Sequence, residues 1–185
     1  MYDITGFGAA PHPNYGRILL SPVLAGEQHL AEIVLNPLSW YADNGITLHL
    51  GKEVTRIDRV RRRVVAADGT EAEYDRLLLA TGSVPFILPV PGKDLEGVIG
   101  YRDIHDTQTM IDTARQKKHA VVIGGGLLGL EAANGLKLRG MEVTVVHLAG
   151  WLLERQLDPV AGALLEKSLA ERGLAFLLNT ATTEI

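Results

Sequence analysis

The sequence predicts an α/β fold that contains a Rossmann-like βαβαβ unit and an antiparallel β-meander. Short β-branched runs alternate with helical patterns, and no repeat of fixed short period is present. A glycine-rich string, Gly124–Gly129, stands between an apolar run and an amphipathic one. An Asp68-Gly69 pair, a strong hairpin signal, separates two strand-like runs.

The first part of the chain begins with a short predicted strand, Tyr2–Phe7, and a proline-containing loop, Pro11–Gly16. A short helix follows at Leu38–Asp43, and the pair Asn44-Gly45 ends it because both residue types tolerate positive φ. Ile46–Leu50 is the next predicted strand. This order fits an α/β domain.

The meander is predicted from three strand-like runs, Val54–Ile57, Arg63–Ala67 and Glu73–Leu79. Arg59–Arg62 separates the first two, and Asp68-Gly69 separates the last two. Turn residues between β-branched runs favour antiparallel hairpins. We therefore expect three antiparallel strands here.

A more regular unit follows the predicted helix His105–Gln116, which we expect to be the hinge into it. Strand and helix patterns alternate there, and the helix stop signal is Gly173. The expected elements are the strands His119–Ile123, Glu142–His147 and Ala175–Leu178 and the helices Leu127–Arg139 and Pro159–Arg172. This βαβαβ order is half of a doubly wound nucleotide-binding fold.

The glycine-rich string has the G-x-G-x-x-G spacing of a dinucleotide-binding loop. Gly124 would allow the tight turn, Gly126 would let a pyrophosphate approach the backbone, and Gly129 would let the helix lie close to the strand. The first helical residues, Leu127 and Leu128, would contribute free N–H groups and positive partial charge. A chance glycine-rich loop is the alternative, but the strand before and the helix after favour nucleotide binding.

Three further residues near this string have open roles. His147 stands where an acid about 20 residues beyond the glycines would hold the ribose hydroxyls. Because an imidazole can bind a ribose hydroxyl or, when protonated, a 2′-phosphate, this residue does not decide between NADH and NADPH. Glu131 could stabilise the helix N-terminus or be a polar group where nicotinamide and flavin meet. Arg155 could assist a phosphate, although a solvated cation is the simpler reading.

The composition excludes several function classes. Hydrophobic residues make up 46% of the chain and the net charge is −4, so we expect a packed globular protein with no attraction to nucleic acid. The basic run Arg59, Arg61–Arg63 has no interleaved aromatic residues and reads as a solvated hairpin. The chain has no cysteine, and its six histidines show no ligand spacing, so a metal site is not expected. With neither a leader nor a membrane-length apolar run, we expect a cytoplasmic protein without membrane insertion.

Several strings resemble the pyridine-nucleotide-disulfide-oxidoreductase superfamily, and most closely its NAD(P)H-dependent nitrite reductase large subunits. The strings are Tyr15–Ser21, Leu78–Ser83, Gly124–Ala133 and His147–Asp158. The resemblance implies FAD in a first domain and NAD(P)H in a second one inserted within it, here residues 1–112 and 113–185. It also implies that the chain is part of a longer protein, whose first strand and glycine loop would precede Met1.

The resemblance carries further residue roles onto this chain. Residues expected to line FAD by position are Arg17, Val54, Ala80, Thr81, Gly82 and Arg102. Val54 could instead be plain core and Arg102 a surface charge. Ala10 stands where a Glu would hold the FAD ribose, and Gly6 interrupts a buried strand, so the resemblance is weakest at the FAD site. Pro22 occupies the position of a redox cysteine in some relatives, which excludes thiol chemistry.

The activity implied by the resemblance is hydride transfer from NAD(P)H to FAD, with electrons passed onward for nitrite reduction in nitrate assimilation. An electron acceptor domain or protein is the expected partner, and sirohaem and an iron–sulfur cluster are expected only in other parts of the parent protein. No residue here is expected to be a catalytic acid or base. A ferredoxin or rubredoxin reductase and a nucleotide-binding fragment without catalysis are the alternatives. The oligomeric state is open, with a homo-oligomer among the options.

Overall fold

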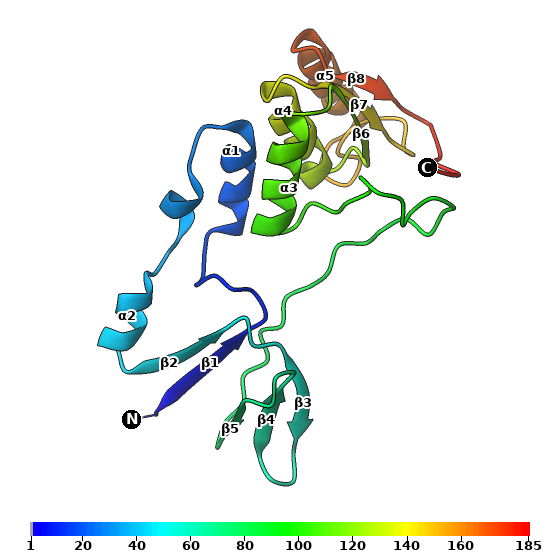
Figure 1. The fold of residues 1–185 in the computed structure, drawn as a ribbon. Helices are drawn as coiled ribbons and strands as arrows, with labels where there is room; N and C mark the ends of the chain where they lie inside the picture. The colour runs from blue at the N-terminus through cyan, green and yellow to red at the C-terminus, as the bar shows by residue number, and fades with distance from the viewer. Residues whose placement is uncertain (1) are drawn as a thin grey trace. The chain divides into compact units, whose positions relative to one another are not determined.

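The computed structural model describes residues 2–185 and shows the α/β architecture that the sequence predicts (Figure 1). The chain divides into two compact units. The first unit comprises the described residues up to Gly16 together with Ile33–Ser83, and the second comprises Arg17–Glu32 and Val84–Ile185. The assignment of residues 1–112 to FAD and 113–185 to NAD(P)H stays a prediction.

The first unit begins with two parallel strands. β1 (Ile4–Gly8) pairs in register with β2 (Ile46–Leu50), and α2 (Leu38–Asp43) leads into β2 and packs against it. The rings of Phe7 and His49 stack across this pair with their centroids 4.6 Å apart. The structure therefore confirms all three elements, with β1 shifted toward Gly8.

The meander is confirmed. β3 (Val54–Asp58) and β5 (Glu71–Glu73) both pair antiparallel with the middle strand β4 (Arg63–Ala66). At the turn between β4 and β5, Gly69 has φ of 86° and the N–H of Thr70 donates to Asp68 Oδ1 at 3.1 Å. Asp-Gly is a hairpin signal for these two reasons: glycine tolerates positive φ, and the aspartate side chain accepts a hydrogen bond from the backbone of its own turn.

The third predicted strand, Glu73–Leu79, is wrong in both bounds: β5 begins at Glu71, before the predicted run, and shares only Glu73 with it. The strand ends at Glu73, because β4 is only four residues long and its partner residues end at Arg63. The last backbone bond of this ladder runs from the N–H of Tyr74 to the carbonyl of Arg62. Beyond it the chain leaves the sheet, and Leu78 is 88% exposed.

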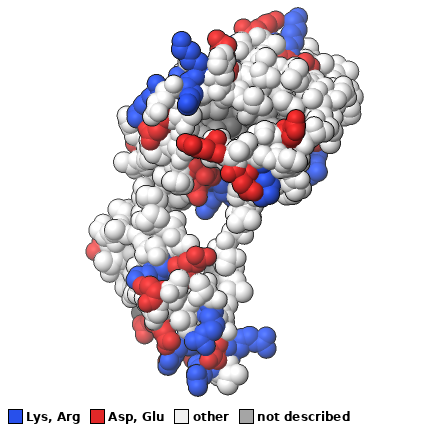
Figure 2. All heavy atoms as spheres, turned by 45° about the vertical axis from the view of Figure 1, so that its right-hand side comes forward, with Lys and Arg blue, Asp and Glu red and all other residues white. Residues whose placement is uncertain are grey.

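Charged side chains of both signs cover the meander. Arg63 donates to Glu71 and Glu73, each at 2.7 Å, and Lys52 pairs with Asp68. In Figure 2, blue and red side chains are interspersed over the surface of the first unit. Arg63, the last residue of the basic run, thus lies beside two counter-charges, as is common on a solvated surface.

The second unit is built on a parallel sheet of strand order β6-β7-β8, so the predicted βαβαβ unit is confirmed. Its strands are β6 (His119–Ile123), β7 (Glu142–Val146) and β8 (Ala175–Leu177), connected by the helices α4 (Leu127–Leu138) and α5 (Pro159–Glu171). The central strand is the most buried of the three, since Val143 and Val145 are 3% and 0% exposed. Asp158 caps α5, accepting from the N–H of Ala161, and Pro159 fits its first turn.

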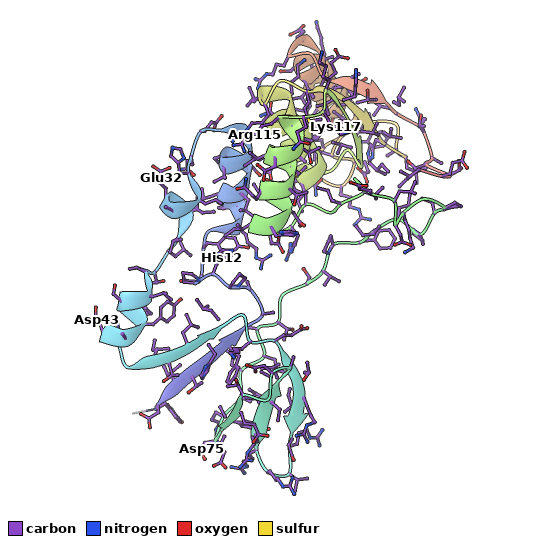
Figure 3. The ribbon with its side chains drawn as sticks, in the orientation of Figure 1. His12, Glu32, Asp43, Asp75, Arg115 and Lys117 are labelled. Atoms are coloured by element: carbon purple, nitrogen blue, oxygen red, sulfur yellow. The ribbon has the colours of Figure 1, made fainter. Side chains whose placement is uncertain are left out.

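Two further helices complete the second unit. α1 (Leu20–Ala25) was not predicted; it lies between two short 3-10 helices, η1 (Arg17–Leu19) and η2 (Leu30–Ile33), and packs against α4. α3 (Ile104–Ala114) begins with a capping box and ends near Arg115 and Lys117 (Figure 3). None of the helices in residues 2–185 has the length and apolar composition needed to cross a bilayer.

Candidate dinucleotide-binding site

The loop from Gly124 to Gly129 joins the end of β6 to the start of α4. Gly124 has φ of 116°, and its N–H donates to the carbonyl of Val146 at 2.8 Å, which ties the loop to β7. Gly126 is the N-cap of α4 and supplies no side chain to cap the helix. The first N–H groups of an α-helix have no partner within the helix, so those of the first turn of α4 can bind an anion.

Gly126 and Gly129, the last two glycines of the motif, differ in their surroundings. A Cβ atom on Gly129 would overlap the carbonyl oxygen of Gly124, so only glycine allows this approach of helix to loop. A Cβ atom on Gly126 would meet nothing within 4 Å, so the space beside this backbone is open. Close packing at Gly129 and an open side at Gly126 are the two properties expected of a pyrophosphate-binding loop. Leu127 and Leu128 are both exposed at the start of α4.

His147, directly after β7, is 8% exposed and bonded at both ring nitrogens. Its Nδ1 accepts the N–H of Gly125 at 3.1 Å, and its Nε2 lies 3.1 Å from Glu154 Oε2. An Nδ1 that accepts an N–H requires the neutral ring to carry its proton on Nε2, which therefore donates to Glu154. The imidazole thus connects the glycine loop to the segment after β7.

A second connection joins the same two segments through the backbone. The N–H of Leu153 donates to the carbonyl of Gly125 at 3.1 Å, and Leu153 has φ of 55°. Leu152 is fully buried, and its side chain fills the space beside Gly125. Positive φ at a non-glycine residue is uncommon and persists where the surroundings hold it. The N–H and the carbonyl of Gly125 thus both form hydrogen bonds within the protein.

Glu131 belongs to a short hydrogen-bond chain on α4. Ser21 Oγ donates to Glu131 Oε2 at 2.6 Å and lies 3.2 Å from the hydroxyl of Tyr101. Burial raises the pKa of Tyr101, with a smaller contribution of the same sign from the Glu131 charge, whereas the Ser21 hydrogen bond lowers it. A cavity of about 150 Å³ lies beside this chain and is lined by Ser21, Pro22, Ala25, Glu27, Glu131 and Asn134.

The whole chain, residues 1–185, matches the family model described as pyridine nucleotide-disulphide oxidoreductase. The chain belongs to this family. The resemblance seen in the sequence is therefore confirmed.

Named relatives within the family are larger than this chain. It is 53% identical over 184 residues to a nitrite reductase [NAD(P)H] of Bacillus subtilis, covering 100% of this chain and 23% of the relative. It is 48% identical over 185 residues to an assimilatory nitrate reductase electron transfer subunit of the same organism, covering 100% of this chain and 24% of that protein. The chain thus spans about a quarter of each.

Solved structures of the family have the same fold. A ferredoxin reductase from Rhodopseudomonas palustris matches with a TM-score of 0.90 and 30% identity, over 98% of this chain and 45% of that one. An NADH:rubredoxin oxidoreductase from Clostridium acetobutylicum matches with a TM-score of 0.87 and 26% identity, over 96% and 47%. The predicted two-dinucleotide-binding flavoprotein fold is therefore confirmed.

The other residues expected at cofactors of this family lie in both units. Arg17 and Arg102 belong to the second unit, where Arg17 Nη1 donates to the carbonyl of Arg102 at 3.2 Å. Val54, at the start of β3, and the segment Ala80–Gly82 belong to the first. Gly82 has φ of 69°, and all three residues of this segment are exposed. Contact of these residues with FAD stays a prediction.

Three residues beside the predicted ones were not singled out from the sequence. Ser21 and Tyr101 are the partners of Glu131, and Glu154 is the partner of His147. Glu154 lies within a string that carries the family resemblance, but its pairing depends on how the loop after β7 folds back. Among residues 2–185 no group of three or more His, Asp or Glu side chains is placed to hold a metal ion.

Proposed function

We propose that this chain is the NAD(P)H-oxidising part of a flavoprotein reductase, with the dinucleotide pyrophosphate bound at Gly124–Gly129. The observation that carries the proposal is the pair of surroundings at Gly129 and Gly126, one closed by the Gly124 carbonyl and the other open. The first turn of α4 would place its N–H groups and its positive partial charge at the phosphates. We infer contributions from Gly124, Gly126, Leu127, Leu128 and Gly129.

The chemistry itself would be that of the cofactors: the nicotinamide of NAD(P)H supplies a hydride, and FAD accepts it and releases electrons singly. The part of this chain is to hold and orient the dinucleotide. Glu131 is held by Ser21 on α4, two residues past the last glycine of the loop. We propose it as a polar contact for the nicotinamide end rather than as a proton donor or acceptor.

We propose that the electrons pass to an acceptor domain that reduces nitrite. The name of one Bacillus subtilis relative, a nitrite reductase [NAD(P)H], supports nitrite as the acceptor. The name of the other, an assimilatory nitrate reductase electron transfer subunit, supports the transfer of electrons onward. Sirohaem and an iron–sulfur cluster would belong to other parts of such a protein. The FAD contacts proposed for this chain are Arg17, Val54, Ala80, Thr81, Gly82 and Arg102.

A second candidate is a reductase that serves a small electron-carrier protein. The ferredoxin reductase structure favours it, because it covers 98% of this chain at a TM-score of 0.90. Reduction of an added ferredoxin by NADH, with no nitrite reductase activity in the complete protein, would support this candidate. Nitrite-dependent NADH oxidation by the complete protein would support the first.

The proposed function is tested by titrating the 185-residue chain with NADH, NADPH and FAD and measuring the heat of binding by calorimetry. We expect saturable binding of at least one reduced nicotinamide dinucleotide. Binding of neither would overturn the assignment of Gly124–Gly129. Dinucleotide binding without FAD retention or dye reduction would instead identify a nucleotide-binding part that needs further segments for catalysis.

A further inference from the structure

We propose that Glu154, held in place by His147, makes this site select NADH over NADPH. The inference rests on the proposed dinucleotide site and concerns its ribose end. His147 alone left the choice between NADH and NADPH undecided, whereas the Glu154 carboxylate predicts a preference for NADH.

The position of Glu154 follows from that of His147. In dinucleotide-binding βαβ units, the residue at the end of the second strand lies at the adenosine ribose, where an acid holds the hydroxyls. His147 has that place after β7, but Gly125 N–H and Glu154 already engage its two nitrogens. The Glu154 carboxylate lies 3.1 Å from Nε2, so it is hydrogen-bonded to the residue that marks the expected ribose position.

Glu154 is also oriented and accessible. The backbone bond from Leu153 N–H to Gly125 O fixes the preceding residue against the glycine loop, and Leu152 is buried beneath it. The Glu154 side chain is 33% exposed, whereas that of His147 is 9% exposed. With Oε2 engaged by the imidazole, Oε1 keeps its capacity to accept a hydrogen bond from a ribose hydroxyl.

The charge then decides the selectivity. A carboxylate accepts a hydrogen bond from the 2′-hydroxyl of NADH, but it repels the 2′-phosphate of NADPH, which carries a charge between about −1.5 and −2 near neutral pH. Because the imidazole is neutral when it accepts from Gly125, it offers no cation to offset this repulsion. Arg155 is the neighbouring cation, and it is exposed.

The experiment measures dissociation constants for NADH and NADPH with the 185-residue chain and its Glu154→Gln variant. We expect the unmodified chain to bind NADH at least about tenfold more tightly, as one unfavourable charge pair near a surface would produce. Glu154→Gln should bring the two constants together, mainly by tightening NADPH binding. Arg155→Ala is the matched control and should leave the preference for NADH in place.

Salt provides a second measurement that needs no variant. Raising the ionic strength screens the repulsion, since the Debye length falls from about 10 Å at 0.1 M to about 3 Å at 1 M. The preference for NADH should therefore shrink with salt. If an arginine instead held the 2′-phosphate, the affinity for NADPH relative to NADH would fall as salt rises.

The role of His147 is tested by two substitutions that each keep one of the two hydrogen bonds of the imidazole. His147→Gln can still donate to Glu154, and His147→Asn can still accept from Gly125. We expect the Gln variant to keep more of the NADH preference than the Asn variant, because it retains the hold on Glu154.

Three results would overturn the inference while leaving the dinucleotide site standing: equal or tighter binding of NADPH by the unmodified chain, an unchanged preference in Glu154→Gln, or a preference that grows with salt. Binding of neither dinucleotide would overturn the proposed function and this inference together.

Discussion

Leu24 of α1 fills the space that a side chain on Gly135 of α4 would need: a Cβ atom there would lie 2.6 Å from Leu24 Cγ. Gly135 is in the middle of a helix, where glycine is normally less favourable than alanine by about 1 kcal/mol. The contact explains its presence, because Leu24 is completely buried against that backbone. Arg139 reinforces the same contact by donating to the carbonyls of Leu24 and Val23 at 2.7 and 2.9 Å.

Gly135→Ala should therefore destabilise the chain rather than stabilise it, by about 1–3 kcal/mol, as overpacking does. Urea unfolding followed by circular dichroism measures the change. In a Leu24→Ala background the space is free, so the same substitution should cost much less. Equal costs in the two backgrounds would show that Leu24 does not set the requirement for glycine.

Gly126→Ala and Gly129→Ala form a pair that separates binding from folding. Alanine at 126 would meet no protein atom within 4 Å, so the free energy of unfolding should change by less than about 1 kcal/mol. Its methyl group would instead occupy the space proposed for the pyrophosphate, so NADH binding should weaken tenfold or more, about 1.4 kcal/mol. Alanine at 129 would overlap the Gly124 carbonyl, so it should lower the free energy of unfolding by more than about 2 kcal/mol. Calorimetry and urea unfolding measure the two effects. Unchanged NADH affinity in Gly126→Ala would contradict the proposed pyrophosphate position.

The hydroxyl of Tyr101 reports on the hydrogen-bond chain beside Glu131. Its pKa is raised by burial and by the Glu131 charge and lowered by the Ser21 hydrogen bond. We expect Ser21→Ala to raise this pKa further and Glu131→Gln to lower it. Ultraviolet difference titration, with Tyr101→Phe to assign the signal, measures the two shifts. Shifts in the same direction would show that the two groups do not act separately on Tyr101.

The ion pair beside the meander turn gives the chain an acid-sensitive contact. Lys52, followed by the N–H and hydroxyl of Thr70, lowers the pKa of Asp68 to about 2. Since this lies below the unfolded value of about 3.9, the pair contributes stability above that pH and loses it as pH falls toward 2. Lys52→Met should raise the Asp68 pKa in a carbon-detected NMR titration. The stability difference between the two proteins should shrink on acidification through the same range, and a constant difference would argue against the pair.

The elements that the sequence predicted well are those whose signals are local. Asn44-Gly45, Asp68-Gly69 and Gly173 each end an element by allowing positive φ, and the structure has Gly45, Gly69 and Gly173 in that conformation. The strand Glu73–Leu79 failed because its length depends on a partner: β4 ends at Arg63, and no local signal marks where pairing stops.

Long-range contacts limited what could be predicted of the site. The spacing of the glycines predicts the loop, but the bond from Gly125 to His147 depends on how β7 lies beside β6. α1 did carry a usable signal, since Leu20, Val23 and Leu24 have helical spacing and Gly26 follows. Its contact with α4 through Ser21 and Glu131 spans 110 residues and leaves no trace in either segment alone.

That span has a consequence for the order of events during synthesis. The chain passes between the two units three times, at Gly16, Glu32 and Ser83, so the second unit is not continuous along the sequence. α1 emerges from the ribosome before Gly135 has been synthesised, so its apolar face stays uncovered until α4 is available to pack against it. Contacts between distant residues slow folding and expose apolar surface meanwhile. A shortened chain that begins at Val84 would lack α1 and would leave the Gly135 face of α4 uncovered.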